Sequence, residues 1–524
     1  MVWRADDPQG DEAGKFKYLA APYTRGLGID VGCGPKKAFP KFIGVDNCVD
    51  TQLFGIPIAP DIKVESCETL PFDDGELDFV FSSHTLEHVT DFKRALAEWW
   101  RVVKPGGHLV LYLPHAELYP RIGEPGSNPD HKHDFLPSHI TDAMAEVAEH
   151  TGMELLEDEV RDGGREYSFY QVYRKRDDGL FHVRQKLPGK TACVVRFGGY
   201  GDMIQAANVF PALKRQGFRI TMMTTPKGHE IIQHDPHVDE WIVIDHDQIP
   251  NNELGECFKQ WAPRFDRFVN LCESVEGTLL AMPGRANHGW PEQVRHRHLN
   301  QNYLEFTAEL AQVPYKSESK FYPAAVERDE ATGYVAEHFG DDAFVVVVAL
   351  AGSSLHKAYP WMDNAMMRVL LDIPEARFVM VGDEFCRILE GGWESESRVR
   401  MESGRLTIRQ TLALASVADC VVGPETGVLN AVAFDEAIGK VVLLSHSSTE
   451  NLTKHWKNTV ALTPPQSVAC YPCHRLHYTD EFCNVHPEVG AAMCAFEINP
   501  QRVAEGIRRI HKRWRGRDDA RRSA

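Results

Sequence analysis

The sequence lacks an apolar run long enough to cross a membrane. The longest, at residues 344–351, is far shorter than the about 20 apolar residues that a transmembrane helix needs. Residues 1–12 also lack the basic start and the apolar stretch of a secretory signal. These absences lead us to expect a cytoplasmic protein.

An excess of positive charge is missing as well. The chain has 57 Lys and Arg residues against 75 Asp and Glu residues, for a formal net charge of −18. Broad capture of nucleic acid or anionic lipid needs the opposite sign, so the composition gives no strong nucleic-acid signal. One local exception is the basic tail at residues 506–524. We expect it either to contact a phosphate-rich membrane surface peripherally or to be a solvated helix end.

A disulfide framework is also absent. The 12 cysteines are scattered over 524 residues, which is typical of free thiols in a reducing compartment. Near the C-terminus, however, four of them lie close together in sequence: Cys470, Cys473, Cys483 and Cys494. Four thiols with one close pair can form a zinc site, and the alternative is that they are buried or surface thiols.

Apolar, β-rich runs alternate with helical patterns along most of the chain, which predicts an α/β fold with parallel sheets covered by helices. The alternation starts three times, so we expect three Rossmann-like regions. A polar segment with Gly and Pro between the first two has no periodicity and is typical of a linker. The expected parts are an N-terminal extension (1–25), a first domain (26–176), the linker (177–190), two lobes (191–330 and 331–505) and the basic tail (506–524).

Glycines follow the first predicted strand, in the run Gly28-Ile-Asp-Val-Gly-Cys-Gly34, and the second predicted strand ends in Asp46. Glycines let the backbone approach a ligand, and a carboxylate at the next strand end can accept both ribose hydroxyl hydrogens. The pattern indicates a nucleoside site. Only residues 35–42 separate Gly34 from Ile43, fewer than the about 10–12 of a full crossover, so the first helix should be truncated.

Three further motifs follow in order: Leu-Pro-Phe at 70–72, LDFVFSSHTLEHV at 77–89 and Lys-Pro-Gly-Gly at 104–107. Together with the glycine run, they resemble the class I methyltransferases of the type 11 kind over residues 26–176. The resemblance implies S-adenosyl-L-methionine as cofactor, bound by Asp30, Gly32, Gly34 and Asp46. Because the family usually carries an acid where this chain has Ser66, we expect weaker cofactor binding.

Histidines gather near the place expected for the methyl acceptor, in the run Asp130-His-Lys-His-Asp134. His131 or His133 can act as a base or as a metal ligand, and the alternative is a structural role for both. We expect His84 and His88 to pack a helix. The sequence indicates no catalytic base, which fits a reaction that depends mainly on aligning nucleophile and sulfonium.

The second half opens with a strand that ends in glycines and an acid, in the run RFGGYGDMI at 196–204. Asp202 would face the cleft between the two lobes and is well placed to take a proton from an acceptor hydroxyl. The last lobe has small residues and a lysine after a strand, in AGSSLHKAYP at 351–360, and an acid, a hydroxyl and a glycine at a helix start, in VGPETGVLN at 422–430. Backbone amides, hydroxyls and an ammonium group bind and stabilise a diphosphate.

These segments resemble glycosyltransferase family 9, the heptosyltransferase family, over roughly residues 190–505. The resemblance implies a GT-B fold and metal-independent, inverting transfer from a nucleotide-diphosphate sugar to a glycan, as in lipopolysaccharide biosynthesis. It also implies Asp202 as general base. The residues implied to contact the nucleotide sugar are Gly201, Ser353, Ser354, Lys357, Glu425, Thr426 and Gly427.

Two alternatives remain open from the sequence. The family commonly has Asp and His where this chain has Glu425 and Asn430. The second hypothesis is therefore that one or both modules are noncatalytic binding or assembly domains. In the third, the acceptor is a modified nucleobase or a protein rather than a glycan. The acidic charge disfavours DNA as an acceptor.

Overall fold

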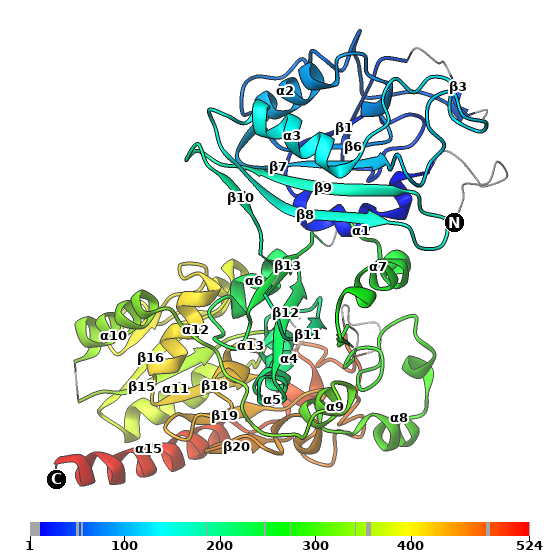
Figure 1. The fold of residues 1–524 in the computed structure, drawn as a ribbon. Helices are drawn as coiled ribbons and strands as arrows, with labels where there is room; N and C mark the ends of the chain where they lie inside the picture. Colours follow the sequence, from blue (N-terminus) through cyan, green and yellow to red (C-terminus); the bar gives the residue numbers. More distant parts are fainter. Residues whose placement is uncertain are drawn as a thin grey trace. The chain divides into compact units, whose positions relative to one another are not determined.

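The computed structural model describes residues 11–48, 52–53, 56–185, 187–245, 248–272, 274–340, 342–352, 358–477 and 483–522. Its contacts divide the chain into two compact units. Unit 1 comprises Met1–Pro188 and Val243–Arg264, and unit 2 comprises Gly189–Ile242 and Phe265–Ala524. The chain therefore leaves unit 2, contributes a segment to unit 1, and returns (Figure 1).

Unit 1 is built on an eight-stranded sheet with the order β10-β8-β9-β7-β6-β1-β2-β5. The strands from β5 to β7 are parallel, whereas β9 runs antiparallel to both β7 and β8. A separate pair, β3 (Gln52–Leu53) and β4 (Ile56–Pro57), is antiparallel. The strands of the large sheet are β1 (Gly28–Val31), β2 (Ile43–Asp46), β5 (Ile62–Lys63), β6 (Leu77–Ser83), β7 (Val103–Pro114), β8 (Met153–Arg161), β9 (Ser168–Lys175) and β10 (Phe181–Val183).

One face of this sheet is covered by α2 (Phe92–Val102) and α3 (Pro137–Val147), which pack side by side (Figure 1). Trp99 of α2 and Met144 of α3 share a buried core with Val80 of β6 and Leu111 of β7. Asp91 caps α2 by accepting a hydrogen bond from the backbone N–H of Arg94, which satisfies one of the free amides at the helix start.

The connection between β1 and β2 places no helix on the opposite face. Residues 32–42, all of which are described, form turns and bends there. The predicted truncation is therefore confirmed. Instead, the N-terminal segment η1 (Ala13–Lys15), α1 (Lys17–Ala20) and η2 (Ala21–Tyr23) lies on this face. Phe16 is fully buried and its ring stacks on Phe81 and Tyr112. The segment expected to be an extension is thus part of the unit 1 core.

Residues 243–264 lie between two parts of unit 2 in the sequence but belong to unit 1, where they pack against this N-terminal segment. They contain η5 (Asn251–Glu253), α7 (Leu254–Trp261) and η6 (Ala262–Arg264). Trp261 is buried and its indole N–H donates to the carbonyl of Tyr18 at 3.0 Å, and Lys17 pairs with Glu253 at 2.9 Å. Residues 243–264 were expected in the lobe 191–330, and the sequence did not predict that they pack elsewhere.

The segment 177–190, expected to be a linker, contains strand β10, which pairs with β8 in parallel. Phe181 and Val183 are about half exposed there. The alternation Phe-His-Val is too short to be recognised as a strand, which explains the difference. The split between the two units falls at Pro188 and Gly189, inside the expected linker.

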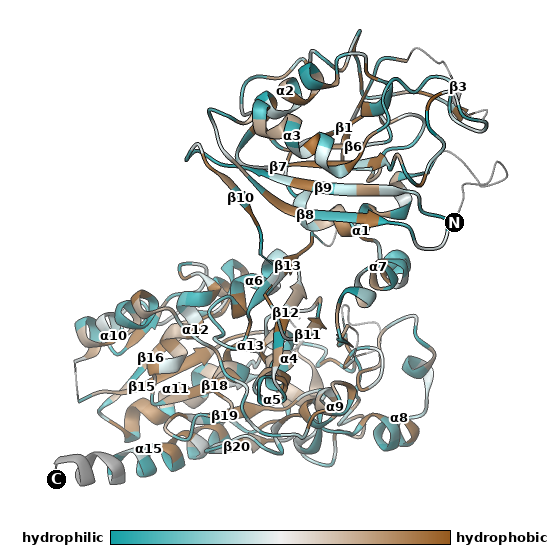
Figure 2. Cartoon of the chain, viewed as in Figure 1, coloured by the Kyte–Doolittle hydropathy of each residue, from teal (hydrophilic) through white to brown (hydrophobic). Residues whose placement is uncertain are grey.

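Unit 2 contains two sheets, in which β11, β12 and β14 and all strands from β15 to β20 run parallel, as the GT-B prediction requires, and the predicted fold class is confirmed. The first has the order β13-β12-β11-β14 and the second β17-β16-β15-β18-β19-β20. All six residues of β15 are buried, as expected for a strand covered on both faces, and Figure 2 shows the hydrophobic colour along such central strands. The strands are β11 (Lys190–Val195), β12 (Phe218–Thr224), β13 (Glu240–Val243), β14 (Arg267–Asn270), β15 (Phe344–Ala349), β16 (Ala376–Val381), β17 (Val399–Met401), β18 (Cys420–Pro424), β19 (Gly439–Leu443) and β20 (Thr459–Leu462).

Helices cover both sheets, and the cores of the two lobes form one continuous cluster that joins Val194 of β11 to Val347 of β15. The helices are α4 (Tyr200–Ala206), η4 (Ala207–Val209), α5 (Phe210–Arg215), α6 (Pro226–Ile232), η7 (Ala286–Gly289), α8 (Glu292–Leu299), α9 (Tyr303–Leu310), α10 (Ala325–Phe339), α11 (Met362–Asp372), η9 (Glu384–Leu389), α12 (Ile408–Val417), α13 (Gly427–Ala431), η10 (Thr449–Thr453), α14 (Met493–Phe496) and α15 (Pro500–Arg522).

The basic tail is not a separate segment, because α15 runs through the expected boundary at residue 506 (Figure 1). Ile507 and Ile510 are fully buried against the second lobe, and Arg508 pairs with Asp372. The apolar positions three residues apart place one face of the basic run on the core. Among the described residues, no helix is both long and apolar enough to cross a membrane.

Candidate functional site

The glycine turn of unit 1 leads from β1 toward β2 in a backbone conformation that favours glycine. Gly32 has φ 72° and Gly34 has φ 54°. A Cβ on Gly32 would overlap the side chain of Thr85, whereas no atom of the described residues, apart from the chain neighbours of Gly34, lies within 4 Å of the place where a Cβ on Gly34 would be. The open space beside Gly34 is where a ligand can approach the backbone.

The two acids predicted to bind the cofactor have different surroundings. Asp46 Oδ2 accepts a hydrogen bond from the Gly34 amide at 3.0 Å, and Oδ1 accepts one from the Cys48 amide at 2.8 Å. Asp30 is 3% exposed and accepts from the Ala38 amide at 2.8 Å. Burial raises the pKa of Asp30 to about 7. The structure therefore joins Asp46 to Gly34 and uses Asp30 to hold the connection between β1 and β2.

The histidines after β6 and β7 separate into two groups. The Nε2 atom of His133 lies 2.9 Å from the carbonyl oxygen of Val89 and anchors the loop. His131, His84 and His88 instead surround Glu87, a fully buried acid that the sequence did not single out. The run His84-Thr-Leu-Glu-His88 directly after a strand was the available signal, and it was interpreted as helix packing.

Asp202 lies in the first turn of α4, immediately after the glycines that end β11. Its Oδ2 accepts a hydrogen bond from the Gly199 amide at 2.8 Å, and its Oδ1 lies 3.3 Å from Arg196 Nη2. The Asp202 side chain is 30% exposed. It is thus held on one side and open to solvent on the other, as a general base must be.

Arg196 is the buried partner of Asp202 and was not singled out from the sequence. It binds Glu276 through two hydrogen bonds, at 3.0 and 2.6 Å, and donates to the carbonyl of Leu271. Burial alone would lower the pKa of Arg196, but the carboxylates of Asp202 and Glu276 raise it above its ordinary value. The guanidinium therefore remains a fixed cation between two acids.

The starts of α4 and α13 meet between the two lobes of unit 2. A Cβ on Gly201 would lie 2.9 Å from Asn430 Nδ2 and 3.5 Å from Gly427 Cα. Gln205 also donates to Asn430 Oδ1 at 3.2 Å. Glycine at 201 and 427 permits this approach, which brings the turn that carries Asp202 to the predicted donor-binding motif.

Glu425 is buried, and neighbouring groups of the chain bind its carboxylate. Oε1 accepts hydrogen bonds from the Ser445 amide at 2.6 Å and the Ser447 amide at 3.3 Å, and His446 Nε2 lies 3.1 Å from Oε2. Thr426 Oγ1 beside it is buried and has no hydrogen-bond partner among the described residues. The predicted residues Ser353, Ser354 and Lys357 lie outside the described residues.

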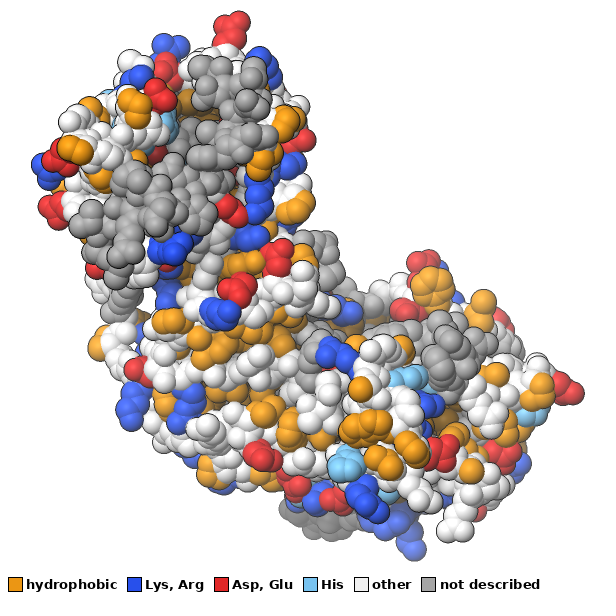
Figure 3. Space-filling model, turned by 90° about the vertical axis from the view of Figure 1, so that its right-hand side faces the viewer, with side chains coloured by type: hydrophobic (Ala, Val, Ile, Leu, Met, Phe, Trp, Pro, Cys, Tyr) orange, Lys and Arg blue, Asp and Glu red, His pale blue; other side chains and the backbone are white. Residues whose placement is uncertain are grey.

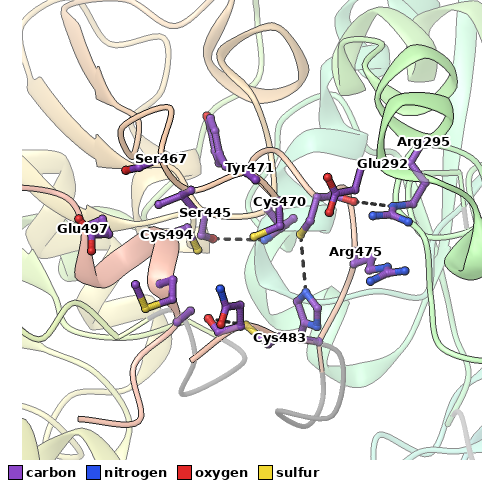
Figure 4. A pocket seen from close by; sticks show the side chains of 18 of the residues that line it. Glu292, Arg295, Ser445, Ser467, Cys470, Tyr471, Arg475, Cys483, Cys494 and Glu497 are labelled. Atoms are coloured by element: carbon purple, nitrogen blue, oxygen red, sulfur yellow. Dashed lines mark hydrogen bonds between the residues drawn. The ribbon is translucent and has the colours of Figure 1, made fainter. Parts of the chain in front are cut away.

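The four C-terminal cysteines line one pocket of about 500 Å³, together with Ser445, His446 and His477 (Figure 4). Cys473 Sγ lies 3.6 Å from His477 Nε2. Burial, with Cys470 and Cys483 nearby, raises the pKa of Cys473 to about 12. The sequence cluster therefore lines one pocket, but among the described residues the ligand atoms that converge closely enough to share a metal ion are those of Glu87, His88 and His131, not these thiols. Zinc binding by the cysteines stays a prediction.

Charged side chains of both signs are scattered over the face drawn in Figure 3. In the basic run, Arg515 Nε lies 3.1 Å from Glu375, an acid that also pairs with His511. His511 and Arg515 of the basic tail, which we expected either to contact a membrane surface or to be solvated, are thus paired with an acid of the protein itself.

Residues 29–111 match the family model described as a methyltransferase domain. An uncharacterized 37.1 kDa protein in transposon TN4556 of Streptomyces fradiae is 33% identical over 102 residues, 16% of this chain and 29% of that protein. The ubiquinone/menaquinone biosynthesis C-methyltransferase UbiE of Psychromonas ingrahamii is 31% identical over 108 residues, 18% of this chain and 40% of that protein. The chain thus spans less than half the length of these relatives. The match over residues 29–111 confirms the predicted methyltransferase-type domain.

Solved structures similar to this chain include the glycosyl transferase family 9 protein from Veillonella parvula, at 12% identity and a TM-score of 0.44, which covers 61% of this chain and 97% of that one. The ADP-heptose lipopolysaccharide heptosyltransferase II of Escherichia coli is 14% identical with a TM-score of 0.42, covering 61% of this chain and 98% of that one. Both families that the sequence resembles therefore recur among the matches.

Proposed function

We propose that the chain is a bifunctional transferase, in which unit 2 transfers a sugar and unit 1 transfers a methyl group. The observation that carries the proposal for unit 2 is the position of Asp202. It is ionically paired at one oxygen, partly exposed, and located where the start of α4 meets the start of α13. The glycine turn with Asp46 carries the proposal for unit 1.

In the sugar transfer, Asp202 removes the proton from an acceptor hydroxyl. The acceptor oxygen forms a bond to the anomeric carbon while the bond from that carbon to the diphosphate oxygen breaks, so the configuration inverts. Arg196 holds the Asp202 carboxylate in place. Lys357 and the amides and hydroxyls of Ser353, Ser354 and Thr426 to Gly427 are proposed to stabilise the departing nucleoside diphosphate, without a metal ion.

The substrates of this step are proposed by chemistry alone. The donor is a nucleotide-diphosphate sugar, and the acceptor is a hydroxyl group of a glycan. Glu425 serves this site indirectly, because its carboxylate binds the Ser445 and Ser447 amides and thereby shapes the loop next to Thr426.

In the methyl transfer, S-adenosyl-L-methionine is proposed to bind at the carboxyl ends of β1 and β2. The open backbone beside Gly34 admits the ligand, and Asp46 accepts hydrogen bonds from the ribose hydroxyls. When bound, the cofactor supplies an activated methyl group. The protein's part is to align an acceptor with that methyl group.

Calorimetry on the full chain tests both halves. We expect S-adenosyl-L-methionine to bind with one-to-one stoichiometry and Asp46→Ala to weaken it. In a panel of nucleotide-diphosphate sugars, we expect at least one to bind regardless of the Asp46→Ala change. If neither kind of ligand binds the wild-type chain, the modules are noncatalytic binding or assembly domains.

A further inference from the structure

Glu87 is a buried acid whose carboxylate forms no hydrogen bond with any other described residue. Its side chain is 0% exposed, and both Oε1 and Oε2 are without a hydrogen-bond partner in the described part of the chain. Such burial is strongly unfavourable for a charged group. The carboxylate therefore needs either a proton or a cation.

Three imidazole nitrogens face the Oε1 atom of this acid. His84 Nδ1 lies at 3.8 Å, His88 Nε2 at 3.9 Å and His131 Nε2 at 3.9 Å. These distances are too long for hydrogen bonds. The donor atoms of Glu87, His88 and His131 all lie within 4.8 Å of one another. Each of these nitrogens and the carboxylate oxygen can offer a lone pair to a metal ion.

The distances between these atoms suit a metal ion. Nitrogen and oxygen ligands at about 2.1 Å in a tetrahedron are about 3.4 Å apart. The observed 3.9 Å from Glu87 Oε1 to each of the His88 and His131 nitrogens is only slightly longer. Bringing these two separations to 3.4 Å needs side-chain movements of about half an ångström, which rotation about χ angles provides.

Contacts behind the rings orient them for coordination. His88 Nδ1 lies 3.3 Å from the carbonyl of Asp130, and an N–H there leaves the lone pair of Nε2 facing Glu87. Metal-binding histidines usually donate their second ring N–H to a carbonyl in this way. This contact therefore turns His88 Nε2 toward the Glu87 carboxylate.

The backbone fixes His131 next to Glu87. The Lys132 amide donates to the carbonyl of Glu87 at 2.7 Å, and the His133 amide approaches the same oxygen at 3.3 Å. The loop after β7 is thus bound to the turn after β6. The side chain of His131 is 6% exposed, so an ion held there would be largely shielded from water.

We propose that Glu87, His88 and His131 bind a divalent transition-metal ion in unit 1, with His84 beside it. Two imidazoles and one carboxylate form the ligand set of catalytic zinc sites, which keep a further position open. The site lies close to the glycine turn, because the Thr85 hydroxyl, two residues before Glu87, donates to the carbonyl of Val31 at 3.3 Å.

The open position suggests what the ion does. An acceptor hydroxyl bound there would lose its proton more readily and be held as an oxygen nucleophile. This role rests on the proposed methyl transfer, whereas binding of the ion does not. The test therefore measures metal binding alone, so that a failure of methyl transfer cannot be mistaken for a failure of the site.

The experiment uses the full chain with Cys470→Ser and Cys473→Ser, because those thiols are a second candidate metal site. After removal of metal with a chelator, Co²⁺ and Zn²⁺ are titrated in separate runs. We expect one ion per chain. The Co²⁺ complex should show visible d–d bands without the strong near-ultraviolet band of thiolate-to-cobalt charge transfer, because the ligands are nitrogen and oxygen.

Variants identify the ligands. Glu87→Gln and His131→Gln should each weaken binding at least about 100-fold, since even contacts behind the ligands contribute 10- to 100-fold. His133→Gln is the matched control, as its ring binds the Val89 carbonyl in the same loop, and it should retain the affinity. Zn²⁺ should raise the melting temperature of the parent chain and of His133→Gln but not that of Glu87→Gln.

Circular dichroism of each metal-free variant checks that it is folded. Glu87→Gln replaces a buried acid with a neutral group of the same size, so the variant should melt no lower than its metal-free parent. If it does not fold, His131→Gln carries the comparison. Equal affinity of the parent, Glu87→Gln and His131→Gln would overturn the proposal, as would the absence of any bound ion in the parent.

Discussion

The guanidinium of Arg196 lies 3.3 Å from the carboxylate of Asp202 and 2.6 Å from that of Glu276. Arg196 is only 2% exposed, so a single buried cation connects the acid that we propose as the base to an acid after β14. The position of Asp202 therefore depends on a residue that does not touch the cleft itself.

Replacing this cation should be costly. Arg196→Met leaves Glu276 and Asp202 without their shared partner, and we expect it to lower the free energy of unfolding of unit 2 by about 3–5 kcal/mol. Urea denaturation measures this. The control is Arg215→Met, which breaks the more exposed pair with Glu318 and should cost at most about 1 kcal/mol. Equal losses in the two variants would mean that Arg196 is not a buried bridge.

Asp30 should make the stability of unit 1 depend on pH. Because burial raises its folded pKa to about 7 from an ordinary value of 3.8, the folded form binds more protons between these values. Its contribution to stability is full below the ordinary pKa and is lost as the pH rises through about 7.

The test for Asp30 is the melting temperature as a function of pH. Asp30→Asn keeps an oxygen that can accept from the Ala38 amide but cannot ionise. We therefore expect its melting temperature relative to wild type to rise from pH 4 to pH 7. A difference that stays constant over this range would contradict the assignment.

The two glycines of the turn in unit 1 should differ in their tolerance of a side chain. Both have positive φ, but a Cβ on Gly32 overlaps Thr85, whereas one on Gly34 contacts none of the described residues beyond its chain neighbours. Gly32→Ala should therefore lower the melting temperature more than Gly34→Ala. Gly34→Ala should mainly weaken binding of S-adenosyl-L-methionine, because its methyl group enters the ligand's space. Calorimetry and thermal melts on both variants check this, and equal melts would argue against the contact with Thr85.

The sequence predicted the fold where strands are buried on both faces. Runs such as Phe344–Ala349 are continuous and apolar, and a parallel sheet is the structure that buries them. The shortened first crossover was also predictable, because the spacing between Gly34 and Ile43 limits it. These features depend on local composition and chain length alone.

The parts that the sequence did not predict depend on distant residues. Trp261 bonds to Tyr18, 243 positions earlier, and nothing in the pattern around α7 indicates that partner. Phe16 similarly becomes a core residue only because the missing helix leaves Phe81 uncovered.

Among the candidate site residues, too, some were predictable from local sequence and others depend on distant residues. Gly34 and Asp46 lie at or just after strand ends, and Asp202 lies in the first turn of the helix after a strand, where a motif is sufficient to find them. Arg196 and Glu87 are buried ionisable groups whose importance depends on what surrounds them. His84 and His88 were interpreted as packing residues, and only the fold brings them and His131 to one carboxylate oxygen.

The most direct test of the account is the turnover of Asp202→Asn with the nucleotide-diphosphate sugar that the wild-type chain binds and a glycan acceptor. Glu318→Gln, an acid of the same lobe that pairs with Arg215, is the control and should retain full activity. We expect Asp202→Asn to bind the donor with unchanged affinity and to lose sugar transfer by at least about 100-fold, the contribution of a general base. Retained turnover in Asp202→Asn would contradict the account.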